Sequence, residues 1–178
     1  MELRNEFTLR RDGYETAALL DPQAKKIAVA EKFGLEIARF TGAHELDHAV
    51  LHPGNVMRRD RPIEGLRWND RSPRPQIERE ADFFAGCFLM PRKPVISVFE
   101  ENFEIKTPLV IDETTAFWLC PDEPDFLLRT LPGSSARALA VASCESFEGR
   151  HFDSLAKRFR VSVTSMAITL YELDLIRE

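Results

Sequence analysis

The chain has 178 residues, of which 44% are hydrophobic and 30% are charged, and its formal net charge is −5 with a pI near 5.5. This length and composition predict one ordinary domain, or one domain with a small appendage, around a buried core. Proteins that bind DNA or anionic membranes usually carry a net positive charge, so the negative charge of this chain disfavours nucleic acid as the main partner.

The three cysteines, Cys87, Cys120 and Cys144, are widely spaced and form no C-x-x-C pair. This usage is typical of thiols in a reducing compartment rather than of a disulfide framework or a thiolate zinc site. Cys144 and His151 could meet, but a structural thiol is favoured over a nucleophile. The charged start, MELRNEFTLRRDG, has no apolar signal core, and no apolar run approaches the roughly 18 residues that span a membrane. We therefore expect a cytoplasmic protein.

The first predicted elements are strands. Residues 14–20 and 26–33 are apolar-rich runs on either side of DPQAK, and Asp-Pro favours a turn, so a β-hairpin or a pair of neighbouring strands is expected. From Gly34 the apolar residues recur at helical spacing instead. This helix should end near His52, because Pro-Gly follows, and Thr41 is a possible cap near its start.

The predicted helix contains HELDH, in which His44 and His48 are four residues apart. Residues with this spacing lie on one helical face, one turn apart, so both imidazoles can bind a single metal ion. Glu45 lies about 100° further round the helix, where its carboxylate can reach a water on the metal without being a ligand. Two imidazoles that hold a metal, and a glutamate that takes a proton from the activated water, are what metal-assisted hydrolysis requires.

His52 extends the same spacing, but on a straight helix it would lie about 12 Å from His44 along the axis, too far to share one ion. We expect it at the helix terminus, where positive charge is favourable. The third ligand must come from elsewhere. A second helix is predicted over 75–90, ended by Pro91, and it carries several carboxylates.

Glu78 on the second helix shares its expected inward face with Ala81, Asp82 and Ala85. A buried carboxylate needs a partner or a metal, so Glu78 is the preferred third ligand. Asp82 could accept the other ring N–H of a ligand histidine and fix its tautomer. Glu80 points to a different side and is the second choice. The alternative is a solvated helix N-terminus, where acidic residues are common.

The rest of the chain is expected to begin with an irregular connection over 55–75. Two strand-like segments, 94–103 and 108–120, should follow it. A helix over 135–147 and a helical pair, 152–159 and 163–176, complete the expected elements. Gly149 should close the helix before the pair. The pair suits a helix-turn-helix, but its second helix has no Lys or Arg before Arg177 and includes Glu172 and Asp174. Because phosphate attraction dominates DNA affinity, protein recognition is favoured over DNA binding.

The segments FTGAHELDHAVLHP and EREADFFAGCFLMP together resemble the ImmA/IrrE-type metallopeptidases, small bacterial and phage proteins. The resemblance includes the preceding strand pair and, more loosely, the tail. It implies an α+β, gluzincin-like fold: a small twisted sheet, an active-site helix with HExxH, a second helix with the glutamate ligand, and C-terminal helix-turn-helix-like helices. We expect a metallopeptidase core over 1–91, a family-variable insert packed on it over 92–148, and the C-terminal helices over 149–178.

Position by position, the resemblance makes His44 and His48 the ligand histidines and Glu45 the catalytic base. Glu78 matches the glutamate ligand, and Asp82 matches the acid that supports the site. The chain departs from the family where a glycine commonly precedes the second histidine, because Asp47 stands at that position. The extra charge near the metal could alter water access or ligand basicity, and it leaves the ligand geometry unchanged.

The activity that the resemblance implies is zinc-dependent endopeptidase cleavage of a specific protein, typically a helix-turn-helix repressor, which we expect to be encoded nearby. A His₂Glu set suits Zn²⁺ and tolerates Mn²⁺ or Fe²⁺. Tyr14, Tyr171 and His151 are the available candidates for stabilising an oxyanion. Two alternatives stay open: a non-proteolytic regulatory module that binds proteins and has a structural or sensing metal site, and a DNA-binding regulator that uses the tail.

Overall fold

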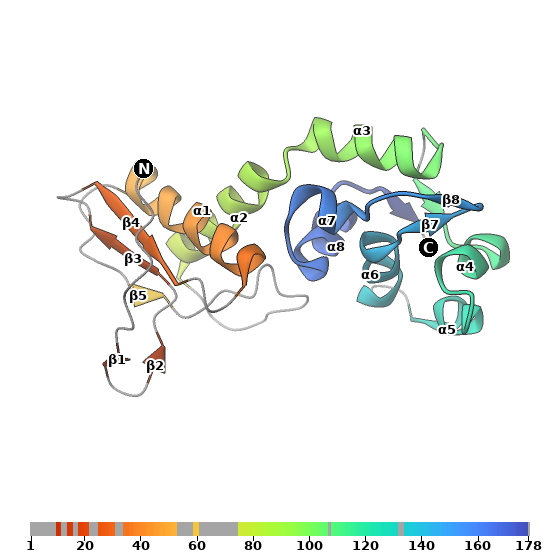
Figure 1. The fold of residues 1–178 in the computed structure, drawn as a ribbon, viewed down its shortest axis with the longest axis horizontal. Coiled ribbons are helices and arrows are strands. Elements are labelled where there is room, and N and C mark those ends of the chain that lie inside the picture. Colours follow the sequence, from red (N-terminus) through yellow and green to blue (C-terminus); the bar gives the residue numbers. More distant parts are fainter. Residues whose placement is uncertain are drawn as a thin grey trace. The chain divides into compact units, whose positions relative to one another are not determined.

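The computed structural model describes residues 10–11, 14–15, 18–21, 25–30, 34–52, 59–60, 75–106, 108–131 and 134–177 (Figure 1). The chain divides into two compact units, Met1–Leu89 and Met90–Glu178. Both contain helices and short strands, so the fold is mixed α+β with small sheets and a predominance of helix. Among the residues described, no helix has the length and apolar character needed to cross a membrane.

Short antiparallel strands form the β-structure of the first unit. β3 (Ala18–Asp21) pairs with β4 (Lys26–Val29) on one side and with β5 (Arg59–Asp60) on the other. The hairpin predicted around Asp-Pro is confirmed, although the turn itself lies outside the described residues. β1 (Arg10–Arg11) and β2 (Tyr14–Glu15) form a separate antiparallel pair. Most of the connection expected over 55–75 also lies outside the described residues.

Two helices complete the described part of the first unit: α1 (Leu35–Leu51) and α2 (Gln76–Leu89). Both predicted helices are confirmed to within one or two residues at each end. The expected cap at Thr41 is wrong, because Thr41 lies inside α1 and is fully buried. The residue before the helix is Gly34, whose φ of 89° is in the region that glycine adopts most readily.

α1 and α2 pack against each other in opposite directions, with Phe40 and Ala43 of α1 meeting Ala85 and Leu89 of α2. The side chains that α2 buries are mostly small, which lets the two helices approach closely. α1 also contacts β3 and β4, so the helix lies between the sheet and α2 (Figure 1). This arrangement turns one polar face of α1 toward α2, away from the sheet.

The second unit begins with α3 (Arg92–Phe103), where the sequence predicted a strand-like segment over 94–103. That expectation is wrong. Val95, Phe99 and Phe103 are four residues apart and all are buried, so the segment has the single apolar stripe of an amphipathic helix. The abundance of β-branched and aromatic residues is therefore a result of core packing and not of strand formation.

The strand expected over 108–120 is also mostly wrong. Within it, Leu109–Val110 (β6) is a short strand, and Glu113–Leu119 (α4) is a helix. The Asp112 carboxylate accepts a hydrogen bond of 2.8 Å from the Thr115 backbone N–H, which satisfies a donor at the start of α4. A capping residue in the middle of an apolar run thus divides one apparent strand into a strand and a helix.

The remaining elements of the second unit are helices and short strands: α5 (Pro124–Arg129), α6 (Ser135–Ser143), β7 (Ser146–Phe147), β8 (Arg150–His151), α7 (Leu155–Phe159), α8 (Val163–Glu172) and β9 (Ile176–Arg177). β9 pairs in parallel with β6. The helix expected over 135–147 is shorter than predicted. Gly149, with φ of 77°, lies in the turn of the β7–β8 hairpin instead of closing that helix.

The helical pair predicted at the C-terminal end is confirmed as α7 and α8, but α8 ends at Glu172 and not near Ile176, which belongs to β9. The Ser162 hydroxyl accepts a hydrogen bond of 3.1 Å from the Ser165 backbone N–H and so caps α8. Leu155 of α7 and Met166 and Leu170 of α8 are at most 1% exposed. α8 also packs on α6, so the pair is part of the core of the second unit.

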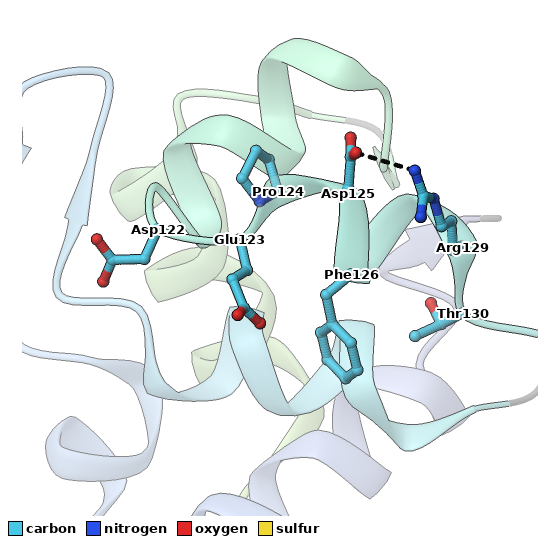
Figure 2. Close-up of a pocket in the computed structure, with 7 residues that line it drawn as sticks. All are labelled: Asp122, Glu123, Pro124, Asp125, Phe126, Arg129 and Thr130. Carbon is cyan, nitrogen blue, oxygen red and sulfur yellow. Dashed lines mark hydrogen bonds and ion pairs between the residues drawn. The ribbon is translucent and has the colours of Figure 1, made fainter.

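The second unit has a surface hollow of about 770 Å³ on α5 and the turn before it. Its lining residues carry mixed charge: Asp122, Glu123, Pro124, Asp125, Phe126, Arg129 and Thr130. In Figure 2 the Glu123 and Phe126 side chains point to one side of α5, while Asp125 points to another and forms an ion pair of 3.2 Å with Arg129. No residue of the predicted metal site lines this hollow.

Candidate metal centre

Next to the apolar contact of Phe40 and Ala43 with α2, α1 buries four ionisable side chains. His44, Glu45 and Asp47 are 0% exposed and His48 is 3% exposed. Burying ionisable groups is costly unless opposite charges, hydrogen bonds or a metal compensate for the lost hydration. These buried side chains therefore require groups that compensate for their lost hydration, and α2 supplies some of these groups.

His44, His48 and Glu78 each place one donor atom within 4.8 Å of the others, and all three side chains are buried. The His44 Nε2 atom is 3.1 Å from His48 Nε2 and 3.3 Å from Glu78 Oε2. His48 Nε2 is 3.7 Å from Glu78 Oε1. The structure thus brings together the three residues that the sequence selected as ligands, two from α1 and one from α2.

The donor set fits a divalent cation such as zinc. Ligand bonds of 2.0–2.2 Å in a tetrahedral shell place neighbouring donors about 3.3 Å apart, and the distances between the donors of His44, His48 and Glu78 lie close to this value. Three electron-rich atoms that face one another in a buried place are stabilised by a positive charge between them. These three residues could therefore hold a metal ion.

Asp82 contacts the opposite side of the His44 ring. Its Oδ1 atom is 2.9 Å from His44 Nδ1, a distance at which the ring N–H donates to the carboxylate. With the proton on Nδ1, a neutral imidazole has its lone pair on Nε2, the atom that faces His48 and Glu78. A hydrogen bond from Nδ1 to Asp82 would favour the tautomer whose Nε2 lone pair can bind a metal.

Glu45 is fully buried and follows His44 directly on α1. It is rotated by about 100° from His44 round the helix axis, so it lies beside the ligand face and not on it. Glu80, the second choice for the third ligand, is exposed on α2 and its Oε1 accepts a hydrogen bond of 2.7 Å from Gln76. It is not among the three clustered donors.

The sequence reasoning missed a contact between His52 and two carboxylates. His52 is the residue at the C-terminal end of α1, and its Nε2 atom is 3.5 Å from Asp47 Oδ2 and 3.4 Å from Glu80 Oε2. The continued four-residue spacing after His48 was the available signal. The spacing shows that His52 continues the series of His44 and His48 on α1, but it cannot identify Glu80 of α2 as a partner of His52.

Two of the three oxyanion candidates belong to the second unit and one to the first. His151 on β8 and Tyr171 on α8 are exposed residues of the second unit. The side chain of Tyr14 lies outside the part of the chain that the structure describes. Burial raises the pKa of the Cys144 thiol, and its Sγ donates a hydrogen bond of 3.2 Å to the Ser146 carbonyl, which favours a structural thiol over a nucleophile.

Zinc should stabilise the protein measurably. If His44, His48 and Glu78 bind the ion only in the folded state, zinc at about 100 times its Kd adds about 2.7 kcal/mol to the free energy of unfolding. For a unit of this size the Tm should rise by roughly 10 °C or more. Thermal unfolding with zinc and with a chelator, alongside the His48→Ala variant, checks this. An equal rise in that variant would place the zinc elsewhere.

A family model described as the IrrE N-terminal-like domain, Peptidase_M78, matches residues 6–119. The match includes the HELDH motif and Glu78, and it continues through α4 in the second unit. Searches of curated proteins and of solved structures each returned no match. The match indicates a metallopeptidase-type function. Because the matched residues make up more than half of the chain, the protein belongs to the ImmA/IrrE family.

Proposed function

We propose that this protein is a zinc-dependent endopeptidase that cleaves a specific protein substrate. The observation that carries the proposal is the convergence of the His44, His48 and Glu78 donor atoms in a buried place on α1 and α2. The neighbouring Glu45 supplies a carboxylate on the same helix as the two histidines. The family match independently indicates a peptidase.

In the proposed mechanism His44, His48 and Glu78 hold the metal, and Asp82 fixes the ring orientation of His44. A divalent cation held there would supply Lewis-acid chemistry, which polarises a scissile carbonyl and lowers the pKa of a water. The Glu45 carboxylate takes a proton from the attacking water and later delivers it to the leaving amine. Burial of Glu45 keeps bulk water away from this proton, which favours its transfer to the amine nitrogen.

We propose Zn²⁺ as the metal because two imidazoles and one carboxylate are a common ligand set of catalytic zinc, with a further position left for water or substrate. Mn²⁺ is the second candidate, since the same donors tolerate it. Loading the metal-free protein with each ion and comparing the activities separates the two. The cysteine usage supports a reducing, cytoplasmic setting, in which the thiols stay reduced.

We propose that the substrate is a helix-turn-helix transcriptional repressor encoded near the gene for this protein, so that cleavage relieves repression. The resemblance of the paired motifs to the ImmA/IrrE-type enzymes supports this proposal. In this view residues 1–91 form the catalytic core, 92–148 a variable insert, and 149–178 helix-turn-helix-like helices. The acidic second helix of the tail favours a protein over DNA as its partner.

The direct test is to incubate the purified, zinc-loaded protein with the repressor encoded beside it and to identify the products by mass spectrometry. We expect cleavage at one or a few defined bonds, and no cleavage after the metal has been removed with a chelator. Restoring zinc should restore cleavage. Cleavage that persists in the chelated protein would show that a contaminating or different activity is responsible.

A second candidate is a non-proteolytic regulatory module that binds a protein partner and uses the metal for structure or sensing. One observation favours it: Asp47 adds a buried charge next to His48, at the position where family members commonly have glycine. This candidate predicts that the partner is bound and stays intact under all metal conditions. Intact partner in a stable complex with the zinc-loaded protein would support it over the peptidase.

A further inference from the structure

Asp47, His52 and Glu80 form a second charged cluster, which we name the His52 clamp. It lies beyond His48 at the C-terminal end of α1. His52 Nε2 is 3.5 Å from the Asp47 carboxylate of α1 and 3.4 Å from the Glu80 carboxylate of α2. Glu80 is itself held in place, because its other oxygen accepts a hydrogen bond from Gln76. One imidazole thus connects the two helices that carry the predicted ligands.

The burial of Asp47 gives this contact its importance. Asp47 is 0% exposed, and neither of its carboxylate oxygens has a hydrogen bond in the part of the chain that the structure describes. Burying a carboxyl group is costly unless a polar partner compensates for the lost hydration. The buried His52 Nε2 atom, 3.5 Å from Asp47 Oδ2, is a polar partner at ion-pair distance. The two buried groups therefore compensate for each other through their proximity.

The position of the His52 clamp along the helix pair suggests what it does. Phe40 and Ala43 pack on Ala85 and Leu89 at one end of the pair. His44 and His48 follow on α1, and the clamp contact comes after them, near the opposite end. On α1 the two predicted ligand histidines thus lie between the apolar contact and the clamp, and on α2 Glu78 lies two residues beyond the clamp residue Glu80. A helix pair fixed at one end alone can pivot, whereas metal–ligand distances must hold to about 0.2 Å.

We propose that His52 is a positioning residue of the metal centre. By joining Asp47 to Glu80, it fixes α1 against the first half of α2 and so keeps Glu78, two residues before Glu80, at bonding distance from the ion that His44 and His48 hold. His52 is not one of the three clustered donors, and its Nε2 lies 3.5 and 3.4 Å from the Asp47 and Glu80 carboxylates instead. The inference rests on the metal centre of the proposed function, but it does not require that the protein be a peptidase.

The test compares four variants of the full chain with the parent protein: His52→Ala, His52→Gln, Glu80→Gln and the double variant His52→Ala/Glu80→Gln. Zinc affinity is measured by competition with a chromogenic chelator, and ligand geometry by the visible absorption of the Co²⁺-loaded protein. We expect His52→Ala to weaken zinc binding by roughly 10-fold to 100-fold, the usual range for groups that orient ligands. His52→Gln keeps an N–H donor and should recover part of the affinity.

Two comparisons separate positioning from a general loss of stability. Glu36→Gln, which neutralises an exposed carboxylate in the first turn of the same helix, should leave zinc affinity and the cobalt spectrum unchanged. The double variant should lose little more than His52→Ala alone, because both changes break one contact. A merely structural role would lower the Tm without changing the cobalt spectrum of the metal-loaded protein.

Parent-like zinc affinity and an unchanged cobalt spectrum in His52→Ala would overturn the proposal, and so would fully additive losses in the double variant. If His52→Ala does not fold, Glu80→Gln tests the same contact, because a change at the exposed Glu80 should leave the fold intact. A parent protein that binds no zinc would overturn both this inference and the metal centre. A parent that binds zinc but cleaves no substrate would count against the peptidase alone.

Discussion

Replacement of Glu45 by glutamine should lower kcat/KM for the true substrate by about 10²-fold to 10⁴-fold while zinc binding stays at the parent level. Glutamine has nearly the same shape as glutamate, so the buried position beside His44 should accept it. The amide cannot take a proton from the attacking water. Cleavage rates with the proposed repressor substrate, together with the zinc content of the purified variant, measure both parts of the prediction.

The matched control for this experiment is Glu36→Gln, which changes an exposed carboxylate on the same helix and should cleave like the parent. If Glu45→Gln cleaves as fast as the parent, the assigned role of Glu45 is wrong. If the parent and Glu45→Gln bind the partner equally and neither cleaves it, the regulatory binding module is the better description. The experiment therefore separates the two candidate functions as well as testing one residue.

Replacement of Glu78 by alanine should weaken zinc binding by more than about 100-fold, a larger loss than that expected for residues that only orient ligands. Two neutral imidazoles would remain, without the carboxylate that balances the charge of the ion. The increase in Tm that zinc causes should disappear with the lost affinity. Chelator competition and thermal unfolding of the same protein samples check both effects.

Glu80→Gln is the comparison for the Glu78 variant, because Glu80 lies two residues away on the same helix and was the other candidate ligand. It should keep more zinc affinity than Glu78→Ala, since Glu80 contacts His52 and not the clustered donors. A reversed order, with Glu80→Gln the weaker binder, would mean that the wrong carboxylate has been assigned to the metal. Equal, parent-like binding by both variants would exclude Glu78 and Glu80 as ligands.

The sequence by itself determined the helices and strands whose ends are marked by strong local signals such as proline. Pro-Gly after His52 and Pro91 after the second helix ended α1 and α2 where the sequence predicted, because proline cannot continue a helix. The spacing of His44 and His48 placed both rings on one face, which is a property of helix geometry alone. The hairpin around Asp-Pro and the two helices of the tail were also predicted from local sequence patterns.

Local signals failed where the same residues suit two structures. The segment that became α3 is rich in valine, isoleucine and phenylalanine, which favour strands, but its four-residue apolar period fits a helix once one face can pack on a core. Gly149 was expected to end a helix and instead occupies a hairpin turn, since a positive φ is needed in both places. Only packing against the rest of the unit chose between these structures.

The tertiary structure alone decided which carboxylates meet which histidines. The sequence favoured Glu78 over Glu80 from the expected inward face of a helix, but the distances of 3.3 and 3.7 Å to His44 and His48 exist only because α1 and α2 pack in opposite directions. The contact of His52 with Glu80 joins residues far apart in the chain. No local periodicity contains such a pair, because the packing of two whole helices determines which of their side chains come within ionic distance.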